Sequence, residues 1–208
     1  MKNVPKENNE TIKAILSSDI RWKKSSIKST SLLANVLYKI KAQEKGVDEL
    51  LMSDSGFITE GAVSNVFCVN ENRIYTPPLE ANILPGITRK VIIEIFQDLN
   101  LNFEEKKIDE EFLFKSDELW ITNTTKGILP IIELDKKIIG RSSAAVQLKK
   151  MIALIAPSDA PAIIYGATGS GKELVAEALH EESRRKGRFV TVNCAAIPKE
   201  LIEAEIFG

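Results

Sequence analysis

Residues 56–76 read GFITEGAVSNVFCVNENRIYT and join two apolar, β-rich runs through Asn70, Glu71 and Asn72. Asn side chains favour tight turns, so this stretch predicts a β-hairpin. Residues 84–100, LPGITRKVIIEIFQDLN, then place Gly86 before a run with helical spacing, which predicts an amphipathic helix. The apolar positions expected to face one way on this helix are Ile87, Val91, Ile92, Ile95 and Leu99.

Short β-rich runs and helical runs alternate on both sides of this stretch, which predicts a mixed α/β domain through Gly140. The other expected elements are a helix with apolar residues at 32, 33, 36, 37 and 40 that Gly46 closes, a strand over 101–108, an acidic helical segment from Asp109, a strand over 119–125 and a strand pair around 134–139.

The pattern changes after Gly140 to an Ala-rich segment. It predicts helix 141–156, strand 162–165, a glycine-rich loop, helix 172–187 and strand 189–194. A strand, a glycine loop and a helix in this order form half of a nucleotide-binding unit. We therefore expect two domains, 1–140 and 141–208.

Composition excludes several classes of protein. The 208 residues are 44% hydrophobic and 27% charged, typical of a globular protein, and the net charge of −1 provides no field for direct nucleic-acid binding. No uncharged apolar run is long enough for a membrane span, and the start of the chain has no signal-peptide pattern. With two distant cysteines, we expect a reduced, cytoplasmic protein without a membrane partner.

Residues 166–172 read GATGSGK and match the phosphate-binding pattern G-x-x-x-x-G-K. Glycines let backbone N–H groups surround phosphate oxygens, the following helix contributes its positive end, and Lys172 neutralises the outer phosphates. The alternative is a glycine turn that merely ends a strand. Glu173 stands where a Ser or Thr usually binds magnesium.

The run from about Ile138 to Gly208, with APSDAP, GKELVA, VNCAA and a final E-x-E-x-F-G, resembles the opening of the AAA+ ATPase domain of sigma-54-dependent transcriptional activators. The resemblance implies ATP, with or without magnesium, at Gly166, Gly169, Ser170, Gly171, Lys172 and Glu173. The family's sigma-contact loop, Walker B strand and arginine finger are not in this sequence, so we expect at most nucleotide binding without hydrolysis. Sigma-54 RNA polymerase is a partner by family analogy only.

The first part resembles the class IV (fold type IV) pyridoxal-phosphate aminotransferases, and most of all the D-amino-acid aminotransferases. The motifs DIRW, IKS-x-x-LL-x-NVL-x-K, TEG-x-x-SNVF, YTPP, L-x-GITR and T-x-TT carry the resemblance over about residues 10–140. The implied fold is the α+β large domain of this family, without its smaller N-terminal domain. By position, Lys28 resembles the Schiff-base lysine and Glu60 the acid that faces the pyridine nitrogen. The implied cofactor-binding residues are Leu84, Gly86, Ile87, Thr88 and Thr124.

The resemblance implies amino transfer from a D-amino acid to a 2-oxo acid with pyridoxal 5'-phosphate, and a homodimer by analogy. Branched-chain aminotransferases and aminodeoxychorismate lyases share the lysine and the glutamate, so the substrate and the choice between transfer and lyase chemistry stay open. The serines common after TEG are replaced by Ala62 and Val63, and Lys126-Gly127 replaces a frequent Ser-Glu. Two alternatives remain, an ATP-binding part of a sigma-54-dependent regulator and a fusion of two inactive fragments.

Overall fold

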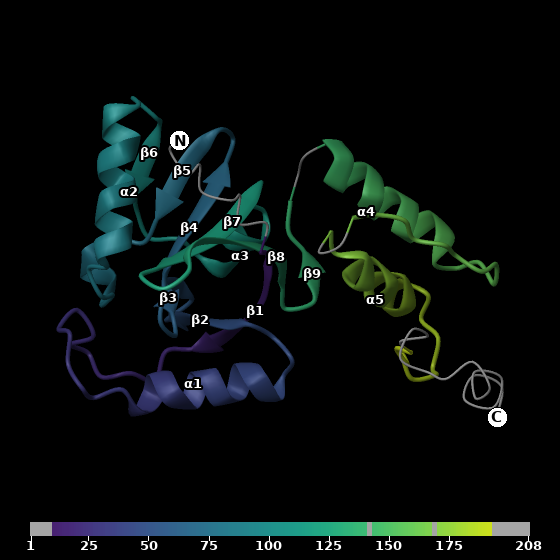
Figure 1. The fold of residues 1–208 in the computed structure, drawn as a ribbon, viewed down its shortest axis with the longest axis horizontal. Helices are drawn as coiled ribbons and strands as arrows, with labels where there is room; N and C mark the ends of the chain where they lie inside the picture. The colour runs from purple at the N-terminus through teal and green to yellow at the C-terminus, as the bar shows by residue number, and fades with distance from the viewer. Residues whose placement is uncertain (1–9, 141–142, 168–169, 193–208) are drawn as a thin grey trace, which may run out of the picture.

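The computed structural model describes residues 10–140, 143–167 and 170–192 (Figure 1). Their nine strands form a mixed sheet in the order β3-β2-β1-β8-β7-β4-β5-β6, and β9 pairs with β8. β1 runs parallel to β2 and β8, and β5 runs parallel to β6, whereas the other ladders are antiparallel. The strands are β1 Ile12–Ser18, β2 Glu49–Asp54, β3 Phe57–Gly61, β4 Asn65–Asn70, β5 Arg73–Thr76, β6 Phe103–Glu105, β7 Glu118–Asn123, β8 Gly127–Leu134 and β9 Lys137–Ile138.

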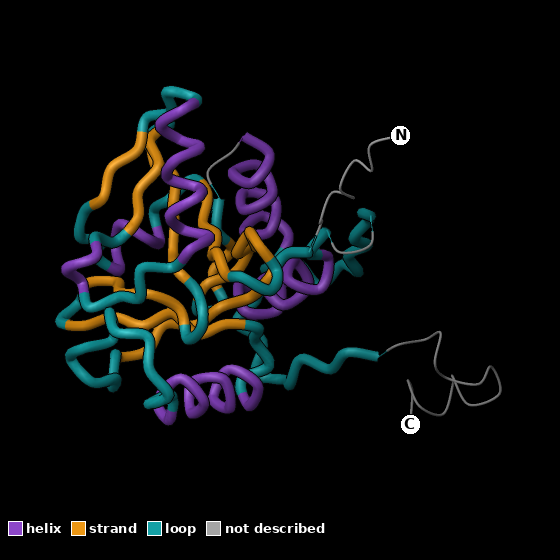
Figure 2. The backbone as a smooth tube through the Cα atoms, turned by 60° about the vertical axis from the view of Figure 1, so that its left-hand side comes forward, coloured by secondary structure: helices purple, strands orange, loops and turns teal. Residues whose placement is uncertain are grey.

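Five α-helices accompany the described part of the sheet: α1 Leu33–Glu44, α2 Ile87–Asp98, α3 Glu110–Phe114, α4 Ser143–Ile155 and α5 Lys172–Glu182. A short 3-10 helix covers Leu79–Ala81. α1 lies below the strands in Figures 1 and 2, and α4 and α5 lie beyond β9, at the end opposite α2 (Figure 1). No described helix has the length and apolar character needed to cross a bilayer. The mixed α/β fold predicted from the sequence is confirmed.

The predicted hairpin is present as β4 and β5, which pair Cys68 with Tyr75. Glu71 and Asn72 occupy the turn with φ of 50° and 60°. Asn tolerates this left-handed region better than most residues, which explains the turn. The final strand pair is also confirmed, because β8 and β9 form an antiparallel ladder.

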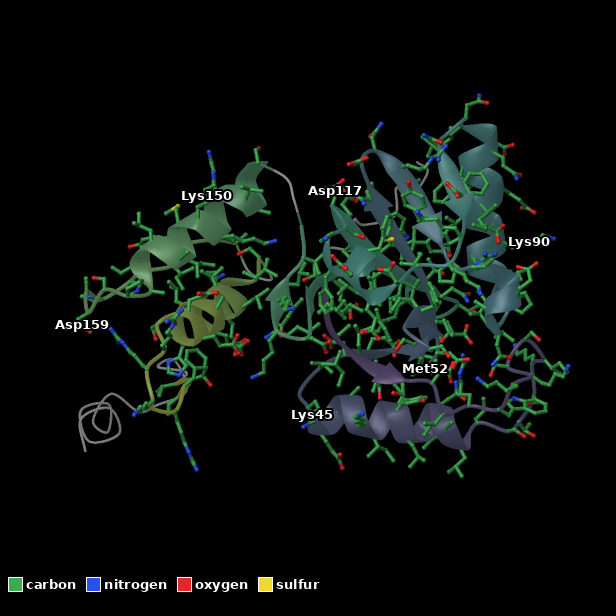
Figure 3. All side chains as sticks on the ribbon, turned by 180° about the vertical axis from the view of Figure 1, so that it is seen from behind. Lys45, Met52, Lys90, Asp117, Lys150 and Asp159 are labelled. Carbon is green, nitrogen blue, oxygen red and sulfur yellow. The ribbon has the colours of Figure 1, made fainter. Side chains whose placement is uncertain are left out.

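The main core lies between the sheet and α3. Asp109 caps α3 by accepting a hydrogen bond from the Phe112 N–H at 2.7 Å. A second cluster between α1 and β2 buries Tyr38, Ala42 and Met52, and Figure 3 shows Met52 inside the molecule. A third joins α2 to the sheet, where Phe67 stacks on Trp120 at 5.8 Å between ring centroids.

Of the five apolar residues expected to share one face of α2, only Ile92 packs on the sheet. Ile92 is buried together with Phe96, whereas Ile87, Val91, Ile95 and Leu99 are 46–72% exposed. Phe96 packs against Phe67, and the buried Arg89 donates to the Pro77 carbonyl. The apolar residues of α2 cover a broader arc than the sheet buries, and periodicity alone does not say which part of the arc packs on the sheet.

The strands predicted over 162–165 and 189–194 are also wrong where the structure describes them. Residues 162–165 and 189–192 are not in strands, and Ile163 and Tyr165 are 76% and 87% exposed. A strand needs a neighbouring backbone to pair with, and the ladders of the described residues include neither segment. The predicted helices before and after the phosphate loop are present as α4 and α5.

α5 contacts the sheet through charges. Lys13 on β1 lies 3.3 Å from Glu133 on β8 and donates to Glu177 on α5 at 3.1 Å. Lys136 pairs with Glu181 on the same helix at 3.3 Å. These contacts place the helix that follows the phosphate loop beside β1 and β8.

Candidate functional site

One cavity of about 250 Å³ lies where four distant segments meet. The segments are the loop between β1 and α1, the residues from the end of β3 into β4, the approach to α2, and the connection from β7 to β8. All seven residues that the sequence assigns to the cofactor site of the first part line this cavity: Lys28, Glu60, Leu84, Gly86, Ile87, Thr88 and Thr124. They come from four segments that lie far apart in the sequence, around 28, 60, 84–88 and 124, so the fold brings these segments together.

Glu60 lies in the wall of the cavity with 5% of its surface exposed. Its carboxylate accepts hydrogen bonds from Arg21 Nη1, from Asn65 Nδ2 at 3.1 Å and from the Leu84 N–H at 3.1 Å. Burial raises the pKa of Glu60 to about 7, although Arg21 and the Leu84 N–H oppose the rise. The cavity therefore holds an acid that changes its charge near neutral pH.

Arg21 is held between two carboxylates. It donates to Asp19 through Nε at 3.0 Å and Nη2 at 2.7 Å, and its other Nη contacts Glu60. Burial tends to raise the pKa of Asp19, but the hydrogen bonds and the charge of Arg21 bring it below its ordinary value. Arg21 lies within the DIRW motif, but nothing in the sequence around it indicates this contact with two carboxylates.

We expect the buried Glu60 to make folding stability depend on pH. Its folded pKa of about 7 lies above its ordinary 4.5, so the contribution is complete below pH 4.5 and is lost as the pH rises to about 7. A shift of this size corresponds to roughly 3 kcal/mol. Urea unfolding at several pH values should show the decline, and Glu60→Gln should flatten it. Glu133, whose pKa burial also raises, is intact in both proteins, so an equal slope in the two would contradict the assignment to Glu60.

Lys28 lies on the loop between β1 and α1, and its side chain is exposed at the cavity. Within the described ranges its ammonium group makes no hydrogen bond or ion pair. Asn82 fixes this loop, because its Oδ1 accepts from the Ser25 N–H at 2.8 Å and its Nδ2 donates to the Trp22 carbonyl at 3.1 Å. Lys28 thus projects from an anchored loop with its amine available.

The N-terminus of α2 lines the same cavity. Gly86 precedes the helix, and Ile87 and Thr88 form its first turn, where N–H groups have no partner within the helix. A Cβ on Gly86 would lie 2.2 Å from Asn65 Oδ1, so the close packing of these two residues requires glycine. Such a helix end attracts anions.

The predicted nucleotide residues lie in the second part of the chain. Lys172 donates to the carbonyls of Gly166 at 3.0 Å and Ala167 at 2.7 Å, so its side chain folds back over the loop. Gly171 begins α5 with φ of 80°, and Ser170 and Glu173 lie on either side of this helix start. Gly169 lies outside the described residues. No described residue of the phosphate loop lines the cavity of the first part, so the two are separate candidate sites.

Comparisons with known proteins match both parts of the chain. The family model described as amino-transferase class IV matches residues 2–134, and the model described as sigma-54 interaction domain matches residues 138–208. The D-alanine aminotransferase of Bacillus licheniformis is 40% identical over 135 residues, which are 65% of this chain and 48% of the relative. The chain spans about half the length of the curated relatives it matches.

Solved structures agree with the first match. The branched-chain aminotransferase of Thermoproteus uzoniensis superposes with a TM-score of 0.59 at 32% identity, over 67% of this chain and 49% of that one. The branched-chain aminotransferase of Escherichia coli superposes with a TM-score of 0.57 at 26% identity, over 67% of this chain and 50% of that one. The similarity thus extends from the sequence to the fold.

Proposed function

Because the chain belongs through residues 2–134 to the class IV aminotransferases, which use pyridoxal phosphate, we propose that its cavity binds this cofactor and transfers amino groups between amino acids and 2-oxo acids. The observation that carries the proposal is the meeting of Lys28, Glu60 and the N-terminus of α2 in one cavity. The relatives named as D-alanine aminotransferases favour a D-amino acid as the donor.

The residues present fit the cofactor. The amine of Lys28 suits the aldehyde of the cofactor, and the buried carboxylate of Glu60 suits its pyridine nitrogen. The N-terminus of α2 suits its phosphate. The tight contact between Gly86 and Asn65 lets the backbone at the start of α2 approach the cavity. Ile87 and Thr88 would bind the phosphate through backbone N–H groups and the Thr88 hydroxyl, with Thr124 opposite, and Leu84 would pack against the ring.

The chemistry of the reaction divides between two side chains. Pyridoxal phosphate, when bound, supplies an electron sink for the bond that breaks at the substrate α-carbon. Glu60 holds a proton at the pyridine nitrogen, and a pKa near neutrality suits a group that shares a proton with this base. Lys28 would hold the cofactor through its amine, and the same amine would move the proton at the substrate α-carbon.

The test uses the full chain with pyridoxal phosphate. Binding should produce a visible absorbance band, and borohydride reduction should fix the cofactor's mass on the peptide that contains Lys28. Addition of D-alanine should then change the band, and a 2-oxo acid should restore it, whereas L-valine serves as the comparison donor. A chain that binds the cofactor but responds to neither amino acid would overturn the transfer activity.

Nucleotide binding at residues 166–173 is a second candidate function. The match of residues 138–208 to the sigma-54 interaction domain supports it, together with the position of Lys172 over its loop at the start of α5. ATP phosphates would take the place of the two carbonyls as partners of Lys172. Contact with sigma-54 RNA polymerase and assembly as a homodimer remain predictions.

We expect ATP to protect the described residues around the loop, 160–167 and 170–190, from hydrogen exchange. Bound phosphates order the loop and engage the first N–H groups of α5, which slows exchange there. Lys172→Ala should abolish this protection, and Lys186→Ala, a change of an exposed lysine of the same part, should preserve it. Identical exchange with and without ATP would contradict nucleotide binding.

A further inference from the structure

Among the residues that the structure describes, the hydroxyl of Thr122 is a buried polar group without a hydrogen-bond partner. Thr122 is 1% exposed, lines the cavity, and its Oγ1 makes no hydrogen bond within the described part of the chain. Leaving a buried hydroxyl unpaired costs free energy, and buried polar groups in native proteins are nearly always hydrogen-bonded. Because the unpaired hydroxyl lies beside a cavity, a ligand in the cavity can supply the missing hydrogen-bond acceptor.

The sheet places this hydroxyl beside the start of α2. Thr122 on β7 lies directly opposite Asn65 on β4, and opposite residues of an antiparallel pair share one face. Asn65 Oδ1 in turn lies against Gly86, the residue that precedes α2. Thr122 therefore lines the buried side of the cavity, near the N-terminus of α2, where an anion would bind.

The amide of Asn65, directly opposite Thr122, is already engaged. Asn65 Nδ2 donates to Glu60 Oε2 at 3.1 Å and to the Leu84 carbonyl at 2.9 Å, which uses both of its hydrogens. Thr124 is exposed and Thr88 is half-buried, so both meet a ligand from the solvent side. The Thr122 hydroxyl is a free donor on the buried side.

We propose that the Thr122 hydroxyl donates a hydrogen bond to a phosphate oxygen of the ligand held at the N-terminus of α2. The assignment rests on the proposed binding of pyridoxal phosphate. It adds a residue that contacts the phosphate from the buried side of the cavity. A phosphate oxygen carries charge, and a hydrogen bond to a charged group is stronger than one between neutral groups. The same hydroxyl has no such acceptor when the ligand lacks a phosphate.

The experiment compares Thr122→Val, which replaces the hydroxyl by a methyl group, with Thr122→Ser, which keeps it. Spectroscopic titration of the full chain should show pyridoxal phosphate binding about 10- to 100-fold more weakly to Thr122→Val and almost normally to Thr122→Ser. Titration with pyridoxal, which lacks the phosphate, should give the same affinity in all three proteins. This difference between the two probes assigns the contact to the phosphate.

Thr76→Val is the matched control. Thr76 is also 1% exposed, but its hydroxyl already donates to the Val66 carbonyl at 2.7 Å, outside the cavity lining. Thr76→Val should lower the free energy of unfolding and leave cofactor affinity unchanged. Thr122→Val should leave the stability of the ligand-free protein unchanged or raise it, because no hydrogen bond is lost.

Three results would overturn the assignment. Unchanged affinity of Thr122→Val for pyridoxal phosphate would mean that water alone satisfies the hydroxyl. An equal loss for pyridoxal and pyridoxal phosphate would place the contact away from the phosphate. A wild-type chain that binds neither probe would refute the proposed function itself, an outcome distinct from the first two.

Discussion

Lys28→Ala should abolish the visible band that pyridoxal phosphate produces with the full chain. Lys28 is the amine that faces the cavity, and no described hydrogen bond or ion pair of its side chain would be lost with it. The phosphate contacts at α2 should still hold the cofactor weakly, without covalent attachment. Absorbance titration and mass analysis of the reduced peptides provide the two measurements.

Lys23→Ala provides the control on the same loop. Lys23 pairs with the exposed Asp54 at 2.5 Å and is not in the cavity lining. Its removal should leave the band and the labelled peptide unchanged. Retention of the band in Lys28→Ala, with the label on another lysine, would refute the role given to Lys28.

Arg21→Ala should destabilise the protein by about 3–5 kcal/mol, the cost of leaving buried charges without their partner. Asp19 and Glu60 would both lose their hydrogen bonds to the guanidinium, and both carboxylates are less than one-tenth exposed. Denaturant unfolding measures the loss. It should shrink as the pH falls toward about 7, because loss of Arg21 raises the pKa of Glu60 further and the variant then takes up this proton at a higher pH than the wild type does.

Arg73→Ala distinguishes this buried arrangement from an ordinary ion pair. Arg73 pairs with Glu104 at 3.0 Å, and both side chains are 43% exposed. Exposed pairs of this kind contribute about 0–1 kcal/mol, so the variant should unfold almost as the wild type does. A similar small effect for Arg21→Ala would show that Asp19 and Glu60 do not depend on Arg21.

Elements encoded by local patterns could be predicted from the sequence, whereas contacts between distant segments could not. The hairpin at residues 70–72 and α2 could be predicted because turn residues and apolar spacing encode them locally. The seven cavity residues could be predicted only through their resemblance to a family, because nothing in their spacing says that they meet. The apolar residues at 162–165 looked like a strand, yet strand formation depends on a partner that a local pattern does not reveal.

Other parts of the site depend on three-dimensional packing that sequence reasoning does not reach. The role of Arg21 follows from its simultaneous contact with Asp19 and Glu60, which lie in different segments. The unpaired hydroxyl of Thr122 is visible only once its neighbours are known. The exposed stripe of α2 likewise shows that a helix can carry more apolar surface than its own sheet covers.

The carboxamide of Asn65 has a consequence for any attempt to redesign this pocket. One small amide touches the acid at one end of the cavity, the Leu84 backbone in the middle and the glycine that opens α2 at the other end. A larger residue at position 86 would push on Asn65 and so disturb the hydrogen bond of Asn65 to Glu60 as well as the start of α2. A substitution that changes ligand binding at one end of this pocket is therefore expected to change binding at the other end as well.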